Sequence, residues 1–252
     1  MKSNTFSLLS LSIPAMTAEQ AKQRLFHLLD TPSPSLVFTP KTTMLGDLLR
    51  HPKRKVLFHR AALLLPDGIG ILILSRLMGT PLPQRLTGID MAETVLAEAE
   101  QRGLRVFLLG ACPGVAREAA KRLWERYPRL CICGTHHGYF GQQTEEEGEV
   151  LALLKTAQPH ILLVCMGYPK QESWLVHHGK EIPTLRLAMG LGGSFDVWAG
   201  KQKRAPKFMQ AAGLEWLWRS VREPERLEAF AALPSLVRAA MVQKRLRSKR
   251  SS

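Results

Sequence analysis

The chain has 252 residues, of which 45% are hydrophobic and 22% are charged. This balance excludes intrinsic disorder as the main state and is sufficient for one large buried core. The net charge of +14 favours partners that carry phosphate groups or an anionic surface. The apolar stretches are all shorter than the roughly 20 residues that cross a bilayer, and the N-terminus is too polar for a secretory signal, so we expect a soluble or peripheral protein.

The first third of the chain predicts a mixture of helices and strands. A helix is expected over residues 17–29, with Thr17 as its N-cap. Residues 35–40 predict a short strand ended by a proline, and residues 41–50 a strand running into a loop and a helix. Residues 55–79 predict one or two strands, a Pro-Asp-Gly turn and a helix from Ile71 to Met78.

The middle of the chain predicts a regular alternation of helices and strands. An amphipathic helix over residues 91–102 is stopped by Gly103. Buried strands and their exit loops are then expected at 104–110, 130–140, 160–172 and 185–200, and helices at 113–128, 144–159 and 172–182. Because the strands are continuous apolar runs separated by helices, we predict an α/β fold with a mostly parallel sheet covered by helices on both faces.

The alternation stops near residue 195. Residues 201–252 contain 13 Lys and Arg against 4 Asp and Glu, so most of the net positive charge belongs to the C-terminal segment. The pattern there is helical and basic. We therefore expect an α/β core over residues 1–195 and a basic helical appendage over residues 196–252.

The cysteines and tandem histidines give no pattern of metal ligands. No C-x-x-C pair is present, so we expect reduced core thiols at Cys112, Cys131, Cys133 and Cys165 and neither a disulfide framework nor a zinc site. The histidine pairs at 136–137 and 177–178 lack partners at ligand spacing. We expect surface or supporting roles for them and no metal site.

Polar and glycine residues follow nearly every predicted strand. Ligands of doubly wound sheets collect outside the carboxyl ends of the strands, where either binding or simple turn formation explains a glycine. No dinucleotide fingerprint, Walker lysine motif or G-x-S-x-G elbow is present, so no cofactor is expected. The candidates at these strand ends are Thr39, Asp67, Gly110, Gly138, Tyr139, Gly167, Gln171, Gly192 and Asp196.

Asp67 is the most informative carboxylate because it interrupts the apolar run at residues 61–74. An unpaired charge in such surroundings is costly. Two interpretations stay open from the residues alone: an Asx-turn or helix N-cap, and a general base in a partly dry site. No D-x-D pair occurs that would hold a divalent ion on a diphosphate.

Basic residues of the C-terminal segment lie beside two tryptophans. Arg219, Arg222 and Arg226 recur at intervals of 3 and 4 and therefore share one helix face. Lys203 and Arg204 precede them. A solvated face is the ordinary interpretation, but Trp216 and Trp218 favour a surface that meets an interface or a ligand. Because no base-reading pattern accompanies the charge, no nucleic-acid partner is expected.

Seven ordered motifs together resemble the WecG/TagA/CpsF family of glycosyltransferases, between about Val37 and Arg226. Each motif alone is weak, whereas their common order is specific. The motifs are "PDGIG" at 66–70, "RLTGID" at 85–90, "VFLLGACPGV" at 106–115, "GYF" at 138–140, "MGYPKQE" at 166–172, "GGSFDVWAGKQKRAP" at 192–206, and "GLEWLWR" with "EPER" within 213–226.

The resemblance implies a Rossmann-like, metal-independent, inverting hexosyltransferase. Its donor would be a UDP-sugar, with N-acetylmannosamine the expected sugar, and its acceptor a polyprenyl-diphosphate-linked N-acetylglucosamine. Such enzymes build teichoic acid or other cell-surface polysaccharides at the cytoplasmic face of the membrane, so an anionic membrane surface is an expected partner. Other branches use the uronic acid form of the donor for capsule or exopolysaccharide. The resemblance leaves a homo-oligomer open.

The resemblance also implies roles for individual residues. Asp67 corresponds to the general base, and Thr39 to a threonine that contacts the substrate. Substrate contacts are implied for Gln171 and Asp196, and charge for the diphosphate group for Arg219 and Arg226 of the appendage. Together with Arg204, Arg222 and the other strand-end residues, the residues just named make up the expected site.

Two positions depart from the family pattern. Lys41 stands where the family usually has an asparagine two residues after the threonine. Ala229 stands where the family commonly has a further arginine. Arg222 or Arg238 is available to supply the missing positive charge. Lys170 and Glu172 stay ambiguous between holding their loop together and binding a ligand.

Overall fold

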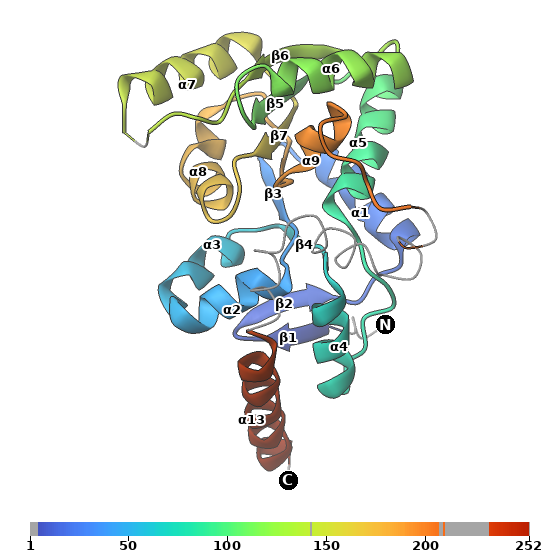
Figure 1. The fold of residues 1–252 in the computed structure, drawn as a ribbon, viewed down its shortest axis with the longest axis vertical. Coiled ribbons are helices and arrows are strands. Elements are labelled where there is room, and N and C mark those ends of the chain that lie inside the picture. The colour runs from blue at the N-terminus through green and yellow to red at the C-terminus, as the bar shows by residue number, and fades with distance from the viewer. Residues whose placement is uncertain (1–4, 142, 207–208, 210–231, 252) are drawn as a thin grey trace.

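A six-stranded parallel sheet forms the centre of the molecule (Figure 1). The computed structural model describes residues 5–141, 143–206, 209 and 232–251, with side chains described through residue 246. The strand order is β4-β3-β8-β7-β5-β6, and every neighbouring pair is parallel. The strands are β3 (Ser35–Phe38), β4 (Leu63–Leu64), β5 (Val106–Gly110), β6 (Ile132–His136), β7 (Ile161–Cys165) and β8 (Leu187–Gly190).

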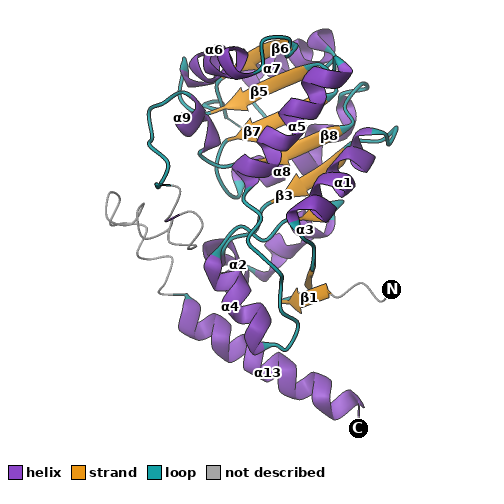
Figure 2. Ribbon diagram, turned by 90° about the vertical axis from the view of Figure 1, so that its right-hand side faces the viewer, coloured by secondary structure: helices purple, strands orange, loops and turns teal. Residues whose placement is uncertain are grey.

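Helices cover both faces of this sheet (Figure 2). One face packs against α1 (Ala18–Leu29), α5 (Gly88–Arg102), α6 (Val115–Arg126) and the short α9 (Ser194–Trp198). The other packs against α2 (Thr42–Arg50), α3 (Lys55–His59), α4 (Ile69–Leu77), α7 (Glu145–Ala157) and α8 (Lys170–His178). The predicted α/β class with helices on both faces is confirmed.

Alternation along the strands separates the two cores. In β5, Val106 and Leu108 belong to the core under α1, α5 and α6, whereas Phe107 and Leu109 belong to the core under α7 and α8. Successive side chains of a strand point to opposite faces, so a strand buried on both sides must be apolar throughout. This explains the continuous apolar runs of the sequence.

Two further elements complete the second core. The antiparallel hairpin of β1 (Thr5–Leu8) and β2 (Leu11–Pro14) buries Phe6, Leu8, Leu11 and Ile13. The C-terminal helix α13 (Leu233–Ser251) buries Leu236 and Ala240 in the same core and contacts α2 and α4. In both views α13 lies at the opposite end of the molecule from α6 and α7 (Figures 1 and 2).

The strand order creates a switch point between β5 and β7. From β5 the chain continues outward through α6 to β6, and from β7 it continues in the opposite direction through α8 to β8. Their exit loops therefore diverge, as in other open α/β sheets that bind ligands at this edge. The carboxyl-terminal edge of the sheet is where the site residues must be sought.

Several expectations about individual elements were wrong. Residues 42–50 form helix α2 from its first turn, with no strand before it after Phe38. Of the one or two strands expected over residues 55–79, the structure has one, β4, and residues 55–59 form helix α3, which was not expected. Short apolar runs have no clear period, and here a 3-10 turn at Pro52–Arg54 leads the chain directly into a helix. The hairpin at residues 5–14 and helix α9 were not expected.

Two of the cysteines are also not core residues. Cys112 and Cys131 are exposed, Cys133 is half-buried and Cys165 is buried. All four are free thiols. Cys112 and Cys131 lie beside strands β5 and β6 and not within them, which explains how an apolar neighbourhood in the sequence leads to an exposed position.

Candidate functional site

Loops that follow four different strands meet at the carboxyl-terminal edge of the sheet. The ammonium group of Lys41, after β3, lies 3.5 Å from Oδ2 of Asp67, after β4. It also lies 4.0 Å from the position that a Cβ of Gly192, after β8, would occupy. The Gly192 N–H in turn donates to Oε1 of Gln171, after β7, at 3.0 Å. We call Lys41, Asp67, Gln171, Glu172 and Gly192 the edge cluster.

Asp67 is positioned by its backbone. Its N–H donates to the carbonyl of Pro40 at 3.2 Å, which fixes the loop after β4 against the loop after β3. Helix α4 has Gly68 as its N-cap, with no side-chain capping hydrogen bond. The capping interpretation of Asp67 is therefore not realised. Its side chain is 17% exposed and faces Lys41, so the carboxylate is partly dry yet within reach of a ligand.

Thr39 is buried at the exit of β3. Its hydroxyl donates to the carbonyl of Gly190 at 3.4 Å, and its methyl group lies 3.1 Å from where a Cβ of Gly88 would stand. Thr39 thus ties β3 to β8 and packs tightly against the start of α5 at Gly88. In this structure its visible partner is the backbone of a neighbouring strand.

Gln171 joins two loops from a buried position. It is 1% exposed, and its Oε1 accepts the hydrogen bond from Gly192 while its Nε2 donates to Oε1 of Glu172 at 2.9 Å. A Cβ on Gly190 would stand 2.9 Å from Nε2 of Gln171, so a side chain at position 190 would push the Gln171 amide out of its present position. Gln171 therefore fixes the shape of the edge cluster.

Glu172 is a buried carboxyl that sequence reasoning left ambiguous. It is fully buried, and its Oε2 has no hydrogen-bond partner among the described residues. Burial raises the pKa of Glu172 to about 7, against the opposing effects of the hydrogen bond from Gln171 and the charge of Lys41. Only its burial in three dimensions identifies it, because "QE" in a helix is unremarkable in sequence.

Lys170 has the loop-holding role. Its ammonium group donates to the carbonyls of Gly138 at 2.7 Å and Phe140 at 2.6 Å, and it lies over the Phe140 ring. It therefore fastens the loop after β6 to the start of α8. Gly138 belongs to this loop and packs close to Met166, with its N–H bonded to the carbonyl of Ala111.

Two glycines of the expected site have backbone conformations that favour glycine. Gly110 has φ of 136°, and a Cβ there would stand 2.3 Å from the carbonyl oxygen of Cys165. Gly167 has φ of 73° in the turn that starts the segment after β7. Both shape strand exits, and neither offers a side chain to a ligand.

Tyr139 and Asp196 lie farther along the edge. Tyr139 is 65% exposed, and its hydroxyl accepts a hydrogen bond from the Cys112 thiol at 3.3 Å. The charge of Asp196, in the first turn of α9, acts on Tyr139, so the two are near each other. Among the described residues, no hydrogen bond or ion pair joins them to the edge cluster, and Cys112 is a neighbour that the sequence did not suggest.

Arg204 is engaged in an ion pair away from the edge cluster. Its guanidinium makes a two-pronged contact with Asp90, at 2.7 and 3.0 Å, and Thr87 donates to the same carboxylate. Burial opposes ionisation of Asp90, but the hydrogen bonds from Arg204 and Thr87 lower its pKa overall. The pair links the segment after α9 to the start of α5. Arg219, Arg222, Arg226 and Ala229 lie outside the described residues.

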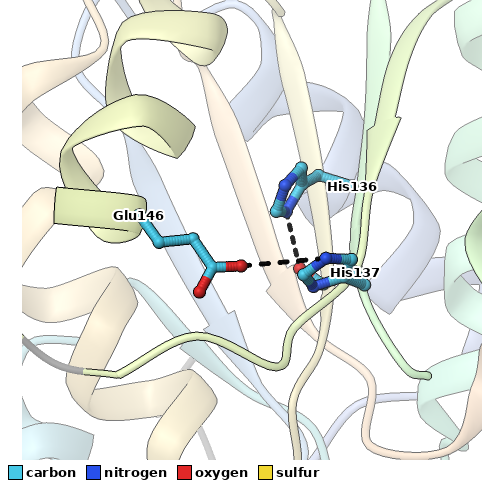
Figure 3. Close-up of side chains that lie close together, drawn as sticks. All are labelled: His136, His137 and Glu146. Atoms are coloured by element: carbon cyan, nitrogen blue, oxygen red, sulfur yellow. Dashed lines mark hydrogen bonds and ion pairs between the residues drawn. The ribbon is translucent and has the colours of Figure 1, made fainter. Parts of the chain in front are cut away.

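One group of possible metal ligands lies near the end of β6 (Figure 3). His136, His137 and Glu146 offer ligand atoms within 4.8 Å of one another. Nδ1 of His136 bonds to the carbonyl of His137 at 2.7 Å, and Nε2 of His137 lies 3.8 Å from Glu146. The imidazole rings are 4.3 Å apart and tilted by 39°, so the two histidines pack against each other. Asp67 is not part of this group.

The edge cluster combines a partly dry carboxylate, an ammonium group and a rigid backbone frame. A carboxylate there can accept a proton, and a cation beside it can attract a phosphate-bearing ligand. A parallel sheet that presents such groups at its carboxyl-terminal edge, with a switch point beside them, has the architecture of Rossmann-like α/β enzymes, which bind their ligands at this edge. The fold and the site together define this class.

The chain belongs to the glycosyl transferase WecG/TagA/CpsF family, whose model matches residues 6–251. It is similar to an N-acetylglucosaminyldiphosphoundecaprenol N-acetyl-beta-D-mannosaminyltransferase of Bacillus spizizenii, with 33% identity over 88% of this chain and 84% of the relative. Proteins of the same name from Bacillus subtilis (34% identity over 68% of this chain and 65% of the relative) and Staphylococcus aureus (33% over 71% and 68%) are also similar.

These comparisons confirm the family that the seven motifs suggested, and with it an enzyme of the glycosyltransferase class. Within the described part of the chain, no helix combines the length and the apolar character needed to cross a membrane.

Proposed function

We propose that this chain transfers an N-acetyl-β-D-mannosaminyl group from a UDP-linked donor to N-acetylglucosaminyl-diphosphoundecaprenol, in cell-surface polysaccharide or teichoic acid synthesis. The names of the relatives from Bacillus and Staphylococcus state this transferred group and this acceptor. The structural observation that carries the proposal is the contact of Asp67 with Lys41 at the carboxyl-terminal edge of the sheet. It places a proton acceptor and a cation side by side.

Asp67 acts as the general base in the proposed reaction. Its carboxylate accepts the proton of the acceptor hydroxyl while that oxygen forms a bond to the anomeric carbon of the donor sugar. The bond between this carbon and the donor diphosphate breaks on the opposite side, and UDP leaves with the bonding electrons. Inversion at the anomeric carbon follows from this single displacement. The charge that grows on UDP requires cations in place before the reaction.

The remaining expected residues are proposed to shape and complete this site. Gln171 and Gly192 hold the loops after β7 and β8 together beside the base, and Thr39 fixes β3 against β8. Tyr139 and Asp196 are proposed to border the donor, while Gly110, Gly138 and Gly167 shape the loops around it. For Arg219, Arg222 and Arg226 we propose contact with the diphosphate, and for Arg204 a supporting role through Asp90.

Substitution of the base tests the proposed function. Asp67→Asn should lower the transfer rate by about 10²–10⁴-fold, because the amide cannot accept the proton, while UDP binding is largely retained. Transfer is measured as UDP release from UDP-N-acetylmannosamine with a synthetic prenyl-diphosphate-N-acetylglucosamine acceptor. Asp30→Asn is the matched control, since Asp30 is also ion-paired, to Arg102, but lies on the surface.

Full turnover of the Asp67→Asn variant would exclude Asp67 as the base. The same assay with other UDP-sugars tests the donor. Preference for the uronic acid donor would replace the mannosaminyl proposal, although none of the three similar proteins named above suggests it. An absence of transfer from every UDP-sugar would contradict the proposal as a whole.

We also propose that α13 contacts the inner face of the cell membrane, where a lipid-linked acceptor would be reached. Its exposed surface combines Met241, Val242 and Leu246 with the cations Arg238, Lys244 and Arg245. Val242 and Leu246 also line an open groove with Leu9 and Leu49. Apolar side chains flanked by cations are suited to an anionic membrane surface.

A further inference from the structure

The cationic side chains near the strand exits differ in how strongly their charges are already bound by protein oxygens. Lys170 is held by two carbonyl oxygens at 2.6 and 2.7 Å, and Arg204 by both oxygens of Asp90. Lys41 has a looser contact, 3.5 Å from Asp67, and its side chain is 35% exposed. A partly exposed lysine on a flexible stem can move to a new partner at little cost.

The position of Lys41 is central within the edge cluster. Its ammonium group lies between the loop after β4, which carries Asp67, and the loop after β8, which carries Gly192. Its charge also acts on buried Glu172 of α8 and on Cys165 at the end of β7. Lys41 therefore projects a positive charge into the place where three strand exits meet.

We propose that Lys41 binds the diphosphate of the donor, exchanging its contact with Asp67 for contacts with phosphate oxygens. This inference rests on the proposed function and adds a donor-binding residue to it. A diphosphate carries more charge than one carboxylate and offers several oxygens, so it competes effectively for the ammonium group. The exchange leaves Asp67 unpaired and able to accept the proton of the acceptor hydroxyl.

The exchange links donor binding to activation of the base. Before the donor binds, the ammonium group of Lys41 is paired with the carboxylate of Asp67 and compensates its negative charge. After the donor binds, the same ammonium group stabilises charge that grows on the leaving diphosphate. An asparagine at position 41 would supply hydrogen bonds to the same surroundings but no charge.

The test compares ligands that differ only in phosphate. Binding of uridine, UMP and UDP to the full-length chain is measured by calorimetry for the wild type, Lys41→Asn and Lys41→Arg. Lys41→Asn should weaken UDP binding about tenfold to a hundredfold and leave uridine binding unchanged, with UMP between them. Lys41→Arg should recover most of the UDP affinity because it keeps the positive charge.

Lys121→Asn is the matched control, because Lys121 also lies near a carboxylate, 3.7 Å from Glu118, but on the exposed surface of α6. It should leave all three affinities unchanged. Unchanged UDP affinity in Lys41→Asn would overturn the inference, and so would an equal loss for uridine and UDP, since Lys41 would then organise the uridine site. A wild-type chain that binds no UDP would overturn the proposed function and this inference with it.

Discussion

Glu172 shows how burial changes the chemistry of a single residue. The pKa of Glu172 is raised to about 7 because the carboxyl is fully buried and one of its oxygens has no partner among the described residues. An acid whose pKa is raised in the folded state stabilises the fold while it is protonated. That stabilisation is complete below the unfolded pKa, near 4.5, and is lost as the pH rises through 7.

Glu172→Gln should therefore change the pH dependence of stability. The amide keeps the shape of the protonated acid and cannot ionise, so the variant should equal the wild type near pH 4.5 and exceed it at pH 8. The expected difference in the free energy of unfolding at pH 8 is roughly 3 kcal/mol at most. Denaturant unfolding of both proteins at several pH values measures it.

The exposed Glu149 of α7 provides the control for this comparison. Glu149→Gln makes the same chemical change on the surface and should follow the wild-type curve. Parallel curves for Glu172→Gln and the wild type would show that the carboxyl of Glu172 is not held protonated by the fold.

From the residues alone, the sequence singled out a reactive carboxylate only where one residue was unusual by itself, and the other candidates came from their places at strand ends or from the family resemblance. Asp67 could be selected because it is a charge inside an apolar run. Lys41, Glu172 and Cys112 could not be selected in this way, since their significance depends on loops that are distant in the chain. Lys41 meets Asp67 across 26 positions, and Gln171 meets Gly192 across 21. Sequence patterns alone contain no distance between such loops.

At the level of elements, the backbone at the exit of β5 is tightly constrained. Gly110 combines φ of 136° with a Cβ position only 2.3 Å from the carbonyl oxygen of Cys165. Gly110→Ala should therefore lower the free energy of unfolding by about 2 kcal/mol or more, because both the local conformation and the β5–β7 exits must shift. Urea unfolding of the purified variant measures this loss.

Gly148 is a suitable control because it lies inside α7 with no atom within 4 Å of its Cβ position. Gly148→Ala should raise stability by about 0.5–1 kcal/mol, since alanine is the better helix residue. A Gly110→Ala variant as stable as the wild type would show that the exit of β5 adapts without cost.

Long elements were predictable and short ones were not. Helices α5, α6 and α7 have 12 to 15 residues, N-caps or prolines and a clear apolar period. The five-residue helices α3 and α9 are too short to show a period, so neither was predicted. The hairpin at residues 5–14 did carry a signal: Phe6, Leu8, Leu11 and Ile13 are spaced for one face of a strand pair.

At the scale of the whole molecule, the expected division at residue 195 does not coincide with a break between elements. It falls within α9, whose Phe195 and Trp198 both belong to the core under α6. Helix α13 is likewise packed on the α/β core through Leu236 and Ala240. We propose that the appendage over residues 196–252 packs on the α/β core at both of its described ends, through Trp198 of α9 on one face of the sheet and through α13 on the other.

The contacts that dock α13 on the core determine which of its side chains face outward. Gln243 exchanges hydrogen bonds with the hairpin, to the backbone of Leu9 and Ser7, and Lys244 donates to the carbonyl of Leu77. Leu236 and Ala240 face the core. Val242 and Leu246 are 52% and 59% exposed, so they can be replaced without removing the contacts that dock the helix.

Replacing these two residues tests the proposed membrane contact. The double variant Val242→Glu, Leu246→Glu should bind vesicles containing anionic lipid at least tenfold more weakly, because it loses apolar area and gains repulsion from the surface. Co-sedimentation with phosphatidylglycerol vesicles and with phosphatidylcholine vesicles measures the loss. Leu153→Glu, which alters a leucine 42% exposed on α7 at the other end of the molecule, should bind as the wild type does. Equal binding of all three proteins would place the membrane contact elsewhere than on α13.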